Sequence, residues 1–381
     1  MSKITESAKD DAHPRELRKL PEPVPMPDAE AYHRERELCL AADPLKKKNY
    51  ERYMASRRRS SQLDYLPIKL DIENVSRCNF RCTMCQVSEW HKGQRARDMT
   101  LDEFKSIIDE QRGLVEIKLQ GMGEPLMQRD PFFEMIRYAR EKHIWVRTVT
   151  NASLLHLKDN YKKLVDADVN ELQISVDGAD KATFEEIRRG SVFERVVENC
   201  KLLNAYSREV DRMRTKMWTV VQRANRHQMT DLVNLANDMG FVSMVFALNL
   251  TNWGSDMWSE RNDEVTVEDS MDTDFAWQLV KQGEKLGVRV AFWNITSKYR
   301  TDDPDTLCPW PFERAYVGSD LRVVPCCMIA NPDACEIPDD GDGEFSFTRI
   351  WNNDAYADFR RAHLEGDIPD VCLQCYESRK A

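Results

Sequence analysis

The chain has 381 residues, of which 41% are hydrophobic and 31% are charged, and its formal net charge is −10. This length predicts about two or three domains, each large enough to bury a core without disulfides. The acidic balance argues against a nucleic-acid-binding protein, because such proteins attract phosphates with a basic surface. No apolar run approaches the roughly 18 residues of a membrane span, and no signal peptide is present, which predicts a cytoplasmic protein without a membrane partner.

Eleven cysteines are too many to be incidental in such a chain. Because the number is odd and the predicted compartment is reducing, the cysteines favour metal or cluster ligation over a disulfide framework. Cys200 lies on the apolar stripe of a predicted helix, and Cys39 has no cysteine or histidine at ligand spacing. We therefore predict that both are structural.

The chain divides into three predicted regions. Residues 1–66 are polar and rich in proline, then helical, without a strand pattern. Residues 67–296 alternate short apolar strands with amphipathic helices, and residues 297–381 form a third, smaller region. The predicted strands of the central region are Ile68–Glu73, Val115–Leu119, Ile144–Val149, Glu171–Val176, Lys216–Val221, Val242–Leu248 and Val288–Phe292. The fold class is therefore α/β, a partial (β/α)6 TIM-like barrel followed by a small C-terminal α+β domain.

Three helix starts in the central region have recognisable caps. Thr100 with Glu103 and Ser191 with Glu194 are spaced as capping boxes, and Asp130 precedes a proline at the first helical position. These signals predict where the helices begin and so fix the order of strands and helices.

Cysteine and polar residues follow the predicted strands directly, as expected at the carboxyl ends of a parallel barrel, where active sites lie. Cys78, Cys82 and Cys85 follow the first strand, and the segment Gly121-Met-Gly-Glu-Pro125 follows the second. The third strand is followed by Asn151, and the fourth runs into Ser175-Val-Asp-Gly178.

The spacing C-x3-C-x2-C allows one loop to wrap a small inorganic centre. A structural zinc site wants four ligands, whereas an iron–sulfur cube held by three thiolates keeps one iron free for a substrate or cofactor. Zinc or a simple electron-transfer cluster remains open for the bare triplet.

The triplet, together with GMGEP and ISVDG at later strand ends, resembles the radical S-adenosylmethionine (SAM) superfamily over residues 67–296. The resemblance implies a 4Fe–4S cluster held by Cys78, Cys82 and Cys85, with SAM bound to its fourth iron. By the same resemblance the SAM contacts are Gly123, Glu124, Asn151, Ser175 and Arg188. Asn151 as a turn residue and Arg188 as a helix-surface cation are the alternatives.

The C-terminal region resembles the SPASM or twitch auxiliary-cluster domain, because Cys308-Pro-Trp, Val-Pro-Cys326-Cys327 and a final Cys372-x2-Cys375 occur in that order. The spacing of Cys308, Cys326, Cys372 and Cys375 is similar to the single-cluster arrangement of the aminocyclitol dehydrogenase of butirosin biosynthesis. The resemblance thus implies one auxiliary 4Fe–4S cluster with these ligands. Cys327 is the alternative to Cys326, since neighbouring side chains on a strand face opposite ways, and Cys335 is expected to be a bystander.

The leading functional hypothesis is a radical SAM oxidoreductase that forms a 5′-deoxyadenosyl radical and oxidises a small polar metabolite, a sugar or cyclitol alcohol. An electron donor of the flavodoxin or ferredoxin type is implied, and no general base can be assigned; Cys327 or Cys335 as a hydrogen donor is a further possibility. The alternative is a peptide maturase or epimerase of the same superfamily. A non-catalytic iron–sulfur or zinc protein is the alternative from another class.

Overall fold

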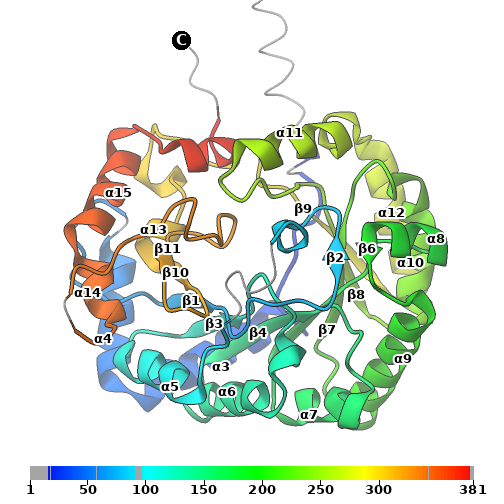
Figure 1. The fold of residues 1–381 in the computed structure, drawn as a ribbon, viewed down its shortest axis with the longest axis horizontal. Coiled ribbons are helices and arrows are strands. Elements are labelled where there is room, and N and C mark those ends of the chain that lie inside the picture. Colours follow the sequence, from blue (N-terminus) through cyan, green and yellow to red (C-terminus); the bar gives the residue numbers. More distant parts are fainter. Residues whose placement is uncertain (1–15, 18, 57, 91–96, 342, 378–381) are drawn as a thin grey trace, which may run out of the picture.

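The computed structural model describes residues 16–377 except 18, 57, 91–96 and 342. Its central element is a curved nine-stranded sheet in the order β11-β10-β1-β3-β4-β5-β7-β8-β9, parallel except for the β10–β11 pair (Figure 1). The strands are β1 Lys69–Ile72, β3 Glu116–Leu119, β4 Trp145–Thr150, β5 Glu171–Ser175, β7 Thr215–Val220, β8 Ser243–Ala247, β9 Arg289–Trp293, β10 Arg314–Val317 and β11 Val323–Val324. The seven predicted strands are confirmed within one residue at each end. Within the described residues the two edge strands, β9 and β11, do not pair with each other, so the barrel is partial, as predicted.

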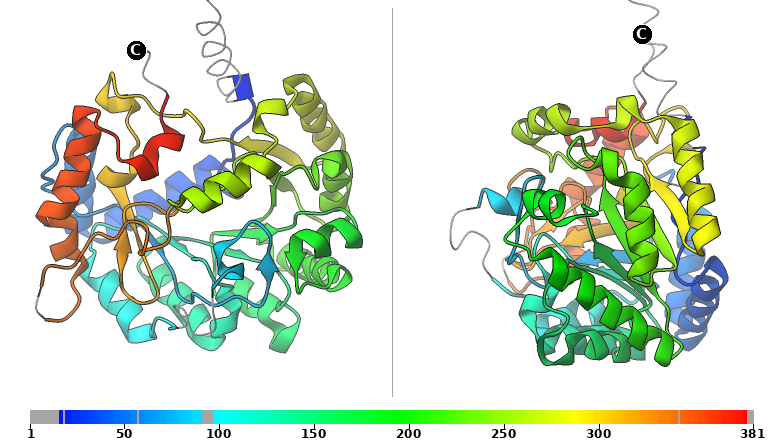
Figure 2. Two further views of the ribbon diagram at one scale, coloured as in Figure 1. Left: turned by 45° about the horizontal axis from the view of Figure 1, so that its top comes forward. Right: turned by 90° about the vertical axis from the view of Figure 1, so that its right-hand side faces the viewer.

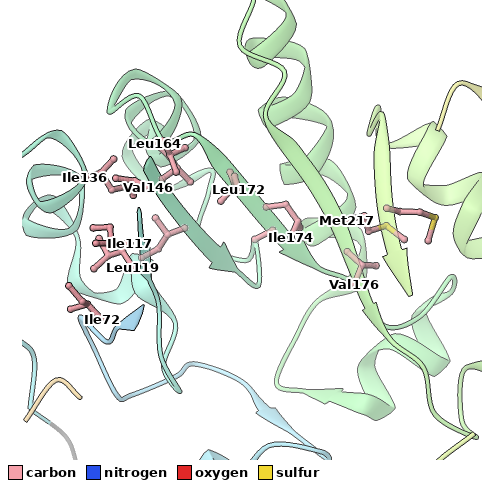
Figure 3. Packing of buried hydrophobic residues seen from close by; sticks show 14 of the residues in the cluster. Ile72, Ile117, Leu119, Ile136, Val146, Leu164, Leu172, Ile174, Val176 and Met217 are labelled. Carbon is pink, nitrogen blue, oxygen red and sulfur yellow. The ribbon is translucent and has the colours of Figure 1, made fainter. Parts of the chain in front are cut away.

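Helices cover the outer face of this sheet (Figure 1). They are α5 Leu101–Glu110, α6 Asp130–Glu141, α7 Asn160–Asp166, α8 Lys181–Ile187, α9 Phe193–Glu209, α10 Met229–Asp238 and α12 Thr273–Leu286, and α11 Asp256–Val265 is inserted before α12. Figure 3 shows the core between the two layers, where strand side chains such as Ile117 and Val146 meet Ile136 of α6 and Leu164 of α7. The predicted structural cysteines, Cys39 and Cys200, are fully buried.

The helix starts confirm only part of the capping prediction. The capping box at the start of α5 is present. The box predicted from Ser191 and Glu194 is wrong, because α9 begins at Phe193, whose N–H donates to Glu185 Oε1 of the preceding helix at 3.0 Å. Asp130 is not an N-cap but the first residue of α6, and its carboxylate accepts a hydrogen bond of 2.9 Å from a lysine on α7. In both cases a tertiary partner replaces the local one.

The inside of the barrel is ionic near the amino ends of the strands. Glu116 lies 3.2 Å from Arg147, which lies 3.0 Å from Glu171, and Glu171 lies 3.2 Å from Lys216. Burial alone would raise the pKa of Glu116, but Lys69 and Arg147 outweigh it and lower that pKa to about 2. These charges are buried as pairs, which is how a protein interior accommodates them.

The N-terminal residues close this ionic end. Pro21 lies beside the edge strand β9, where its carbonyl accepts a hydrogen bond from the Phe292 N–H at 2.8 Å. Lys216 Nζ then donates to the Val24 carbonyl at 2.7 Å, and the Met26 N–H donates to Glu171 Oε2 at 3.2 Å. Two helices follow, α3 Ala29–Ala42 and α4 Pro44–Ser56, and no strand lies among the described residues up to 66. Residues 1–15, which the sequence predicts to be polar, lie outside the described part.

The C-terminal residues extend the same sheet. β10 pairs in parallel with β1, so the strand-like segment of the third predicted region belongs to the barrel sheet rather than to a separate one. Helices α13 Trp310–Glu313, α14 Phe347–Asn352 and α15 Asp354–Glu365 complete this part, and α14 and α15 lie near α4 (Figure 1). In the part of the chain that the structure describes, no helix has the length and apolar character needed to cross a bilayer.

Candidate active site

The three clustered cysteines line one cavity of about 250 Å³ at the carboxyl ends of the strands. Cys78 lies in the loop after β1, Cys82 in the short strand β2 Arg81–Cys82, and Cys85 just before a 3-10 turn. β2 pairs with β6 Arg188–Arg189, and the two lie side by side in Figure 1. Burial first, with a smaller contribution from nearby anions, raises the pKa of Cys78 and of Cys85 to about 12. Binding a metal centre would have to displace those protons.

Glu124 is held in the wall of this cavity and is 2% exposed. Thr150 Oγ1 donates to its Oε1 at 2.6 Å, and the Asn151 N–H donates to its Oε2 at 2.8 Å. Burial raises the pKa of Glu124 to about 7, although these hydrogen bonds oppose the shift. The preceding Gly123 packs so tightly that a Cβ would lie 2.2 Å from the Val75 carbonyl oxygen. The two positions therefore combine a buried carboxyl group with close backbone packing.

Asn151 and Ser175 line the same cavity at the ends of β4 and β5. Asn151 is buried, and its Nδ2 donates to Asn79 Oδ1 at 3.0 Å. Ser153 Oγ donates to Asn151 Oδ1 at 2.6 Å, so the amide is held at both ends. Asn151 is thus both a turn residue, as one interpretation predicts, and part of the cavity wall.

Arg188 also lines the cavity and is not a surface cation, which excludes that alternative for it. Its Nη2 lies 2.6 Å from Asp177 Oδ2, and Asp177 is fully buried. The β2–β6 pairing places Arg188 opposite Cys82. Arg188 Nε is buried and has no hydrogen-bond partner among the described residues, and the guanidinium thus has hydrogen-bonding capacity that Asp177 does not use.

Four of the C-terminal cysteines line a second, largely apolar hollow. They come from three separate segments: Cys308 before α13, Cys326 after β11, and Cys372 with Cys375 near the end of the chain. The Tyr299 N–H donates to the Cys375 carbonyl at 2.9 Å and ties the last segment to the region after β9. These four are the cysteines predicted from sequence for the auxiliary centre.

Cys327 and Cys335 do not line that hollow. Cys327 packs against an apolar cluster that includes Met122, Tyr316 and Val324, and Cys85 packs against the same cluster. Cys326 lines the hollow and Cys327 packs on this cluster, but both follow the end of β11 and their side chains contact each other. The apolar cluster lies between the two cysteine sets.

Sequence reasoning missed part of the first cavity. Asn249, Leu250 and Thr251, which follow β8, also line it, and so does Phe80 beside the cysteines. The strand-end rule that identified the other residues also applies to the three after β8. Of the aromatic residues after the later strands, Trp253 lines the cavity, and its buried Nε1 has no hydrogen-bond partner among the described residues.

A parallel barrel with a three-cysteine loop after its first strand defines a class of iron–sulfur enzyme folds, and two family models match accordingly. Residues 74–236 match the radical SAM superfamily, and residues 308–376 match the iron–sulfur cluster-binding SPASM domain. The chain therefore contains a radical SAM domain and a SPASM domain.

Individual relatives have low sequence identity to this chain. The mycofactocin maturase MftC of Mycolicibacterium smegmatis is 28% identical over 235 residues, 60% of this chain and 56% of that protein, less than two thirds of its length. The PqqA peptide cyclase of Rhodopseudomonas palustris is 23% identical over 315 residues, 81% of this chain and 79% of that protein. Among solved structures, Streptococcus suis SuiB bound to its precursor peptide SuiA covers 86% of this chain and 73% of SuiB, with a TM-score of 0.61 and 15% identity. That likeness is one of fold.

The radical SAM domain implies a 4Fe–4S cluster and SAM, and the SPASM domain implies auxiliary iron–sulfur ligation. The residues present fit these groups. Three thiols face one cavity, the backbone at Gly123 leaves no room for a side chain, and Arg188 Nε has no hydrogen-bond partner among the described residues. The four thiols of the second hollow likewise suit a thiolate-ligated cluster.

Proposed function

We propose that this protein is a radical SAM peptide maturase. A bound 4Fe–4S cluster would supply the electron for reductive cleavage of SAM, and hydrogen abstraction from the peptide would follow from that chemistry. Cys78, Cys82 and Cys85 hold the cluster, and the protein's other contribution is to bind, orient and exclude water. The observation that carries the proposal is the match to the PqqA peptide cyclase, which spans 81% of this chain and therefore reaches into both matched domains.

Different residues of the cavity bind different parts of SAM. Glu124, fixed by Thr150 and Asn151, accepts hydrogen bonds from the amino group of the methionine moiety. The Arg188 guanidinium, which lines the cavity while its Nη2 is paired with Asp177, offers a positive charge to the carboxylate of that moiety. Gly123 supplies close backbone packing, and Asn151 and Ser175 offer hydrogen-bonding groups to the carboxylate or the ribose.

The second hollow holds one auxiliary 4Fe–4S cluster on Cys308, Cys326, Cys372 and Cys375. The three functional regions divide near residues 67 and 297, although β10 joins the central sheet. The described residues before 67 are helical, so a leader peptide would not bind there by adding a strand to a sheet of that region.

The test uses protein reconstituted anaerobically with iron and sulfide, SAM and dithionite. We expect 5′-deoxyadenosine together with a changed peptide mass when a panel of ribosomal precursor peptides is supplied. The C78A/C82A/C85A variant is the control and should give neither product. Unmodified peptides, alongside amino sugars or cyclitols that lose two hydrogen atoms, would contradict the proposal.

That second outcome corresponds to a second candidate, the oxidation of a small polar metabolite. One observation favours it: the apolar cluster around Met122 and Tyr316 contacts both Cys85 and Cys327, the neighbour of Cys326. A substrate near this cluster would lie between the two cysteine sets. The auxiliary cluster could then accept the electron that the substrate radical loses.

A further inference from the structure

The outer side of the cysteine loop carries two adjoining hollows. The larger, of about 400 Å³, and the smaller, of about 140 Å³, share Asn79, Leu154 and Leu157 in their walls. Asn79 is exposed and directly follows Cys78. The two hollows are hereafter called the outer hollows.

The outer hollows are cationic although the protein is anionic. Five cationic side chains and one carboxylate line them, namely Arg77, Arg129, Lys158, Lys163 and Arg195 with Asp130. Asp130 is paired with Lys163 and Arg77 with Asp98, whereas Arg129, Lys158 and Arg195 form no ion pair among the described residues. The net charge of −10 makes such a surface unusual for this chain, and it would attract an acidic partner.

Exposed apolar residues lie among these charges. Leu157 is 46% exposed and Val192 is 42% exposed, and both line an outer hollow. A mixture of exposed apolar side chains and a rim of one charge is typical of a protein-binding surface.

One side chain separates the outer hollows from the cofactor cavity. Phe80 lines both the smaller outer hollow and the cavity that holds the three thiols, and it is 2% exposed. Beside it, Asn151 in the cavity donates a hydrogen bond to Asn79 in the outer hollows. A redox group docked outside would therefore face the cluster across a single layer of residues, and electron transfer is fastest across short separations.

We propose that the outer hollows are the docking site of the electron donor, a small acidic one-electron carrier of the flavodoxin type. One electron leaves the anionic flavin hydroquinone, which becomes the neutral semiquinone, and reduces the cluster held by Cys78, Cys82 and Cys85. No bond is formed or broken. The positive side chains orient the partner, and Leu157 and Val192 contact the apolar surface around its flavin.

The test compares R129E/K158E with K281E/K285E, which makes the same change of charge on exposed residues of α12. A bacterial flavodoxin is the probe, with the reconstituted enzyme. We expect R129E/K158E to weaken flavodoxin binding and to slow hydroquinone-driven 5′-deoxyadenosine formation at least ~10-fold at low salt. Dithionite-driven formation should stay within about twofold, and the control variant should match the wild type. Added salt should slow the wild-type reaction with flavodoxin.

Two results would overturn the proposal. One is unchanged flavodoxin binding by R129E/K158E, whatever its activity. The other is loss of binding to an acidic peptide, with poly-glutamate as the probe, while flavodoxin binding persists, because the surface would then receive a peptide. The assay needs no substrate, since SAM cleavage is followed without one, so it remains informative if the proposed peptide activity fails.

Discussion

The buried pair of Arg188 and Asp177 leads to the most demanding prediction. R188M leaves the fully buried Asp177 carboxylate without the cation 2.6 Å away. Removing one partner of a buried pair costs about 3–5 kcal/mol. The Val220 N–H still donates to Asp177 Oδ1 at 2.8 Å, and Asp177 can take up a proton. We therefore expect a loss near the lower limit, about 3 kcal/mol at pH 7.

The pH dependence follows from the sign of the shift. Burial raises the pKa of Asp177 even beside Arg188, and R188M should raise it further. The folded variant then binds a proton that the unfolded chain releases above about pH 4. Its stability should thus fall as the pH rises from about 4 towards the folded-state pKa, and the deficit should be smaller at pH 5 than at pH 8.

Urea unfolding of the iron-free protein, followed by circular dichroism, measures both effects. R189M is the matched control, because Arg189 is exposed on the same two-residue strand and should cost under about 0.5 kcal/mol. D177N/R188M removes the buried charge and should recover at least about 1 kcal/mol of the R188M loss. A loss below about 1 kcal/mol for R188M, or an equal loss at pH 5 and pH 8, would refute this reasoning.

Three further changes test other parts of the molecule. The pKa of Glu116 is lowered to about 2, so this carboxylate stabilises the folded state fully above its unfolded pKa near 4.5, and the stabilisation disappears as the pH falls towards 2. E116Q should therefore weaken the acid dependence of the urea unfolding midpoint in a pH series. An unchanged dependence of the midpoint on pH would assign this acid sensitivity to other groups. E124Q should weaken SAM binding about 10-fold or more in equilibrium dialysis, because a charge-assisted hydrogen bond is lost; equal affinity would remove Glu124 from the site. C372A/C375A should lower bound iron by about four atoms per chain and C335A should lower it by none, whereas equal iron in all three proteins would contradict the auxiliary site.

The sequence predicted most of the barrel, because alternation and strand-end residues are local signals. The strand ends also located Glu124, Asn151 and Ser175 around one cavity. The features that the sequence did not predict depend on the register between strands and on side-chain partners outside the local pattern. Neither the pairing of Arg188 with Asp177 nor the β2–β6 contact, which places Arg188 opposite Cys82, is revealed by a local pattern.

The same reason explains the wrong helix start at Ser191. A capping box is local, but the Ser191 N–H, which the box would pair with the Glu194 side chain, donates to the Arg188 carbonyl at 3.1 Å. Glu185 from the preceding helix accepts instead from the Phe193 N–H, the first amide of α9. In the C-terminal region, Tyr316 lies on β10, which pairs with β1 some 245 residues earlier in the chain. A local sequence pattern cannot predict a pairing over that separation.

The segment that closes the amino end of the barrel has a mechanical consequence. A closed barrel takes its curvature from its own ring of strand pairs, but this sheet has two free edges within the described residues. The segment with Pro21, Val24 and Met26 bonds to β9, β7 and β5 in turn, and so crosses the amino ends of strands that are already joined through the sheet. In Figure 2 the blue N-terminal helices lie at the opposite end from the light-blue cysteine loop. A cut in this segment would therefore loosen the amino end of the barrel at three strands, while the pairing of those strands within the sheet would still hold the loops at their carboxyl ends.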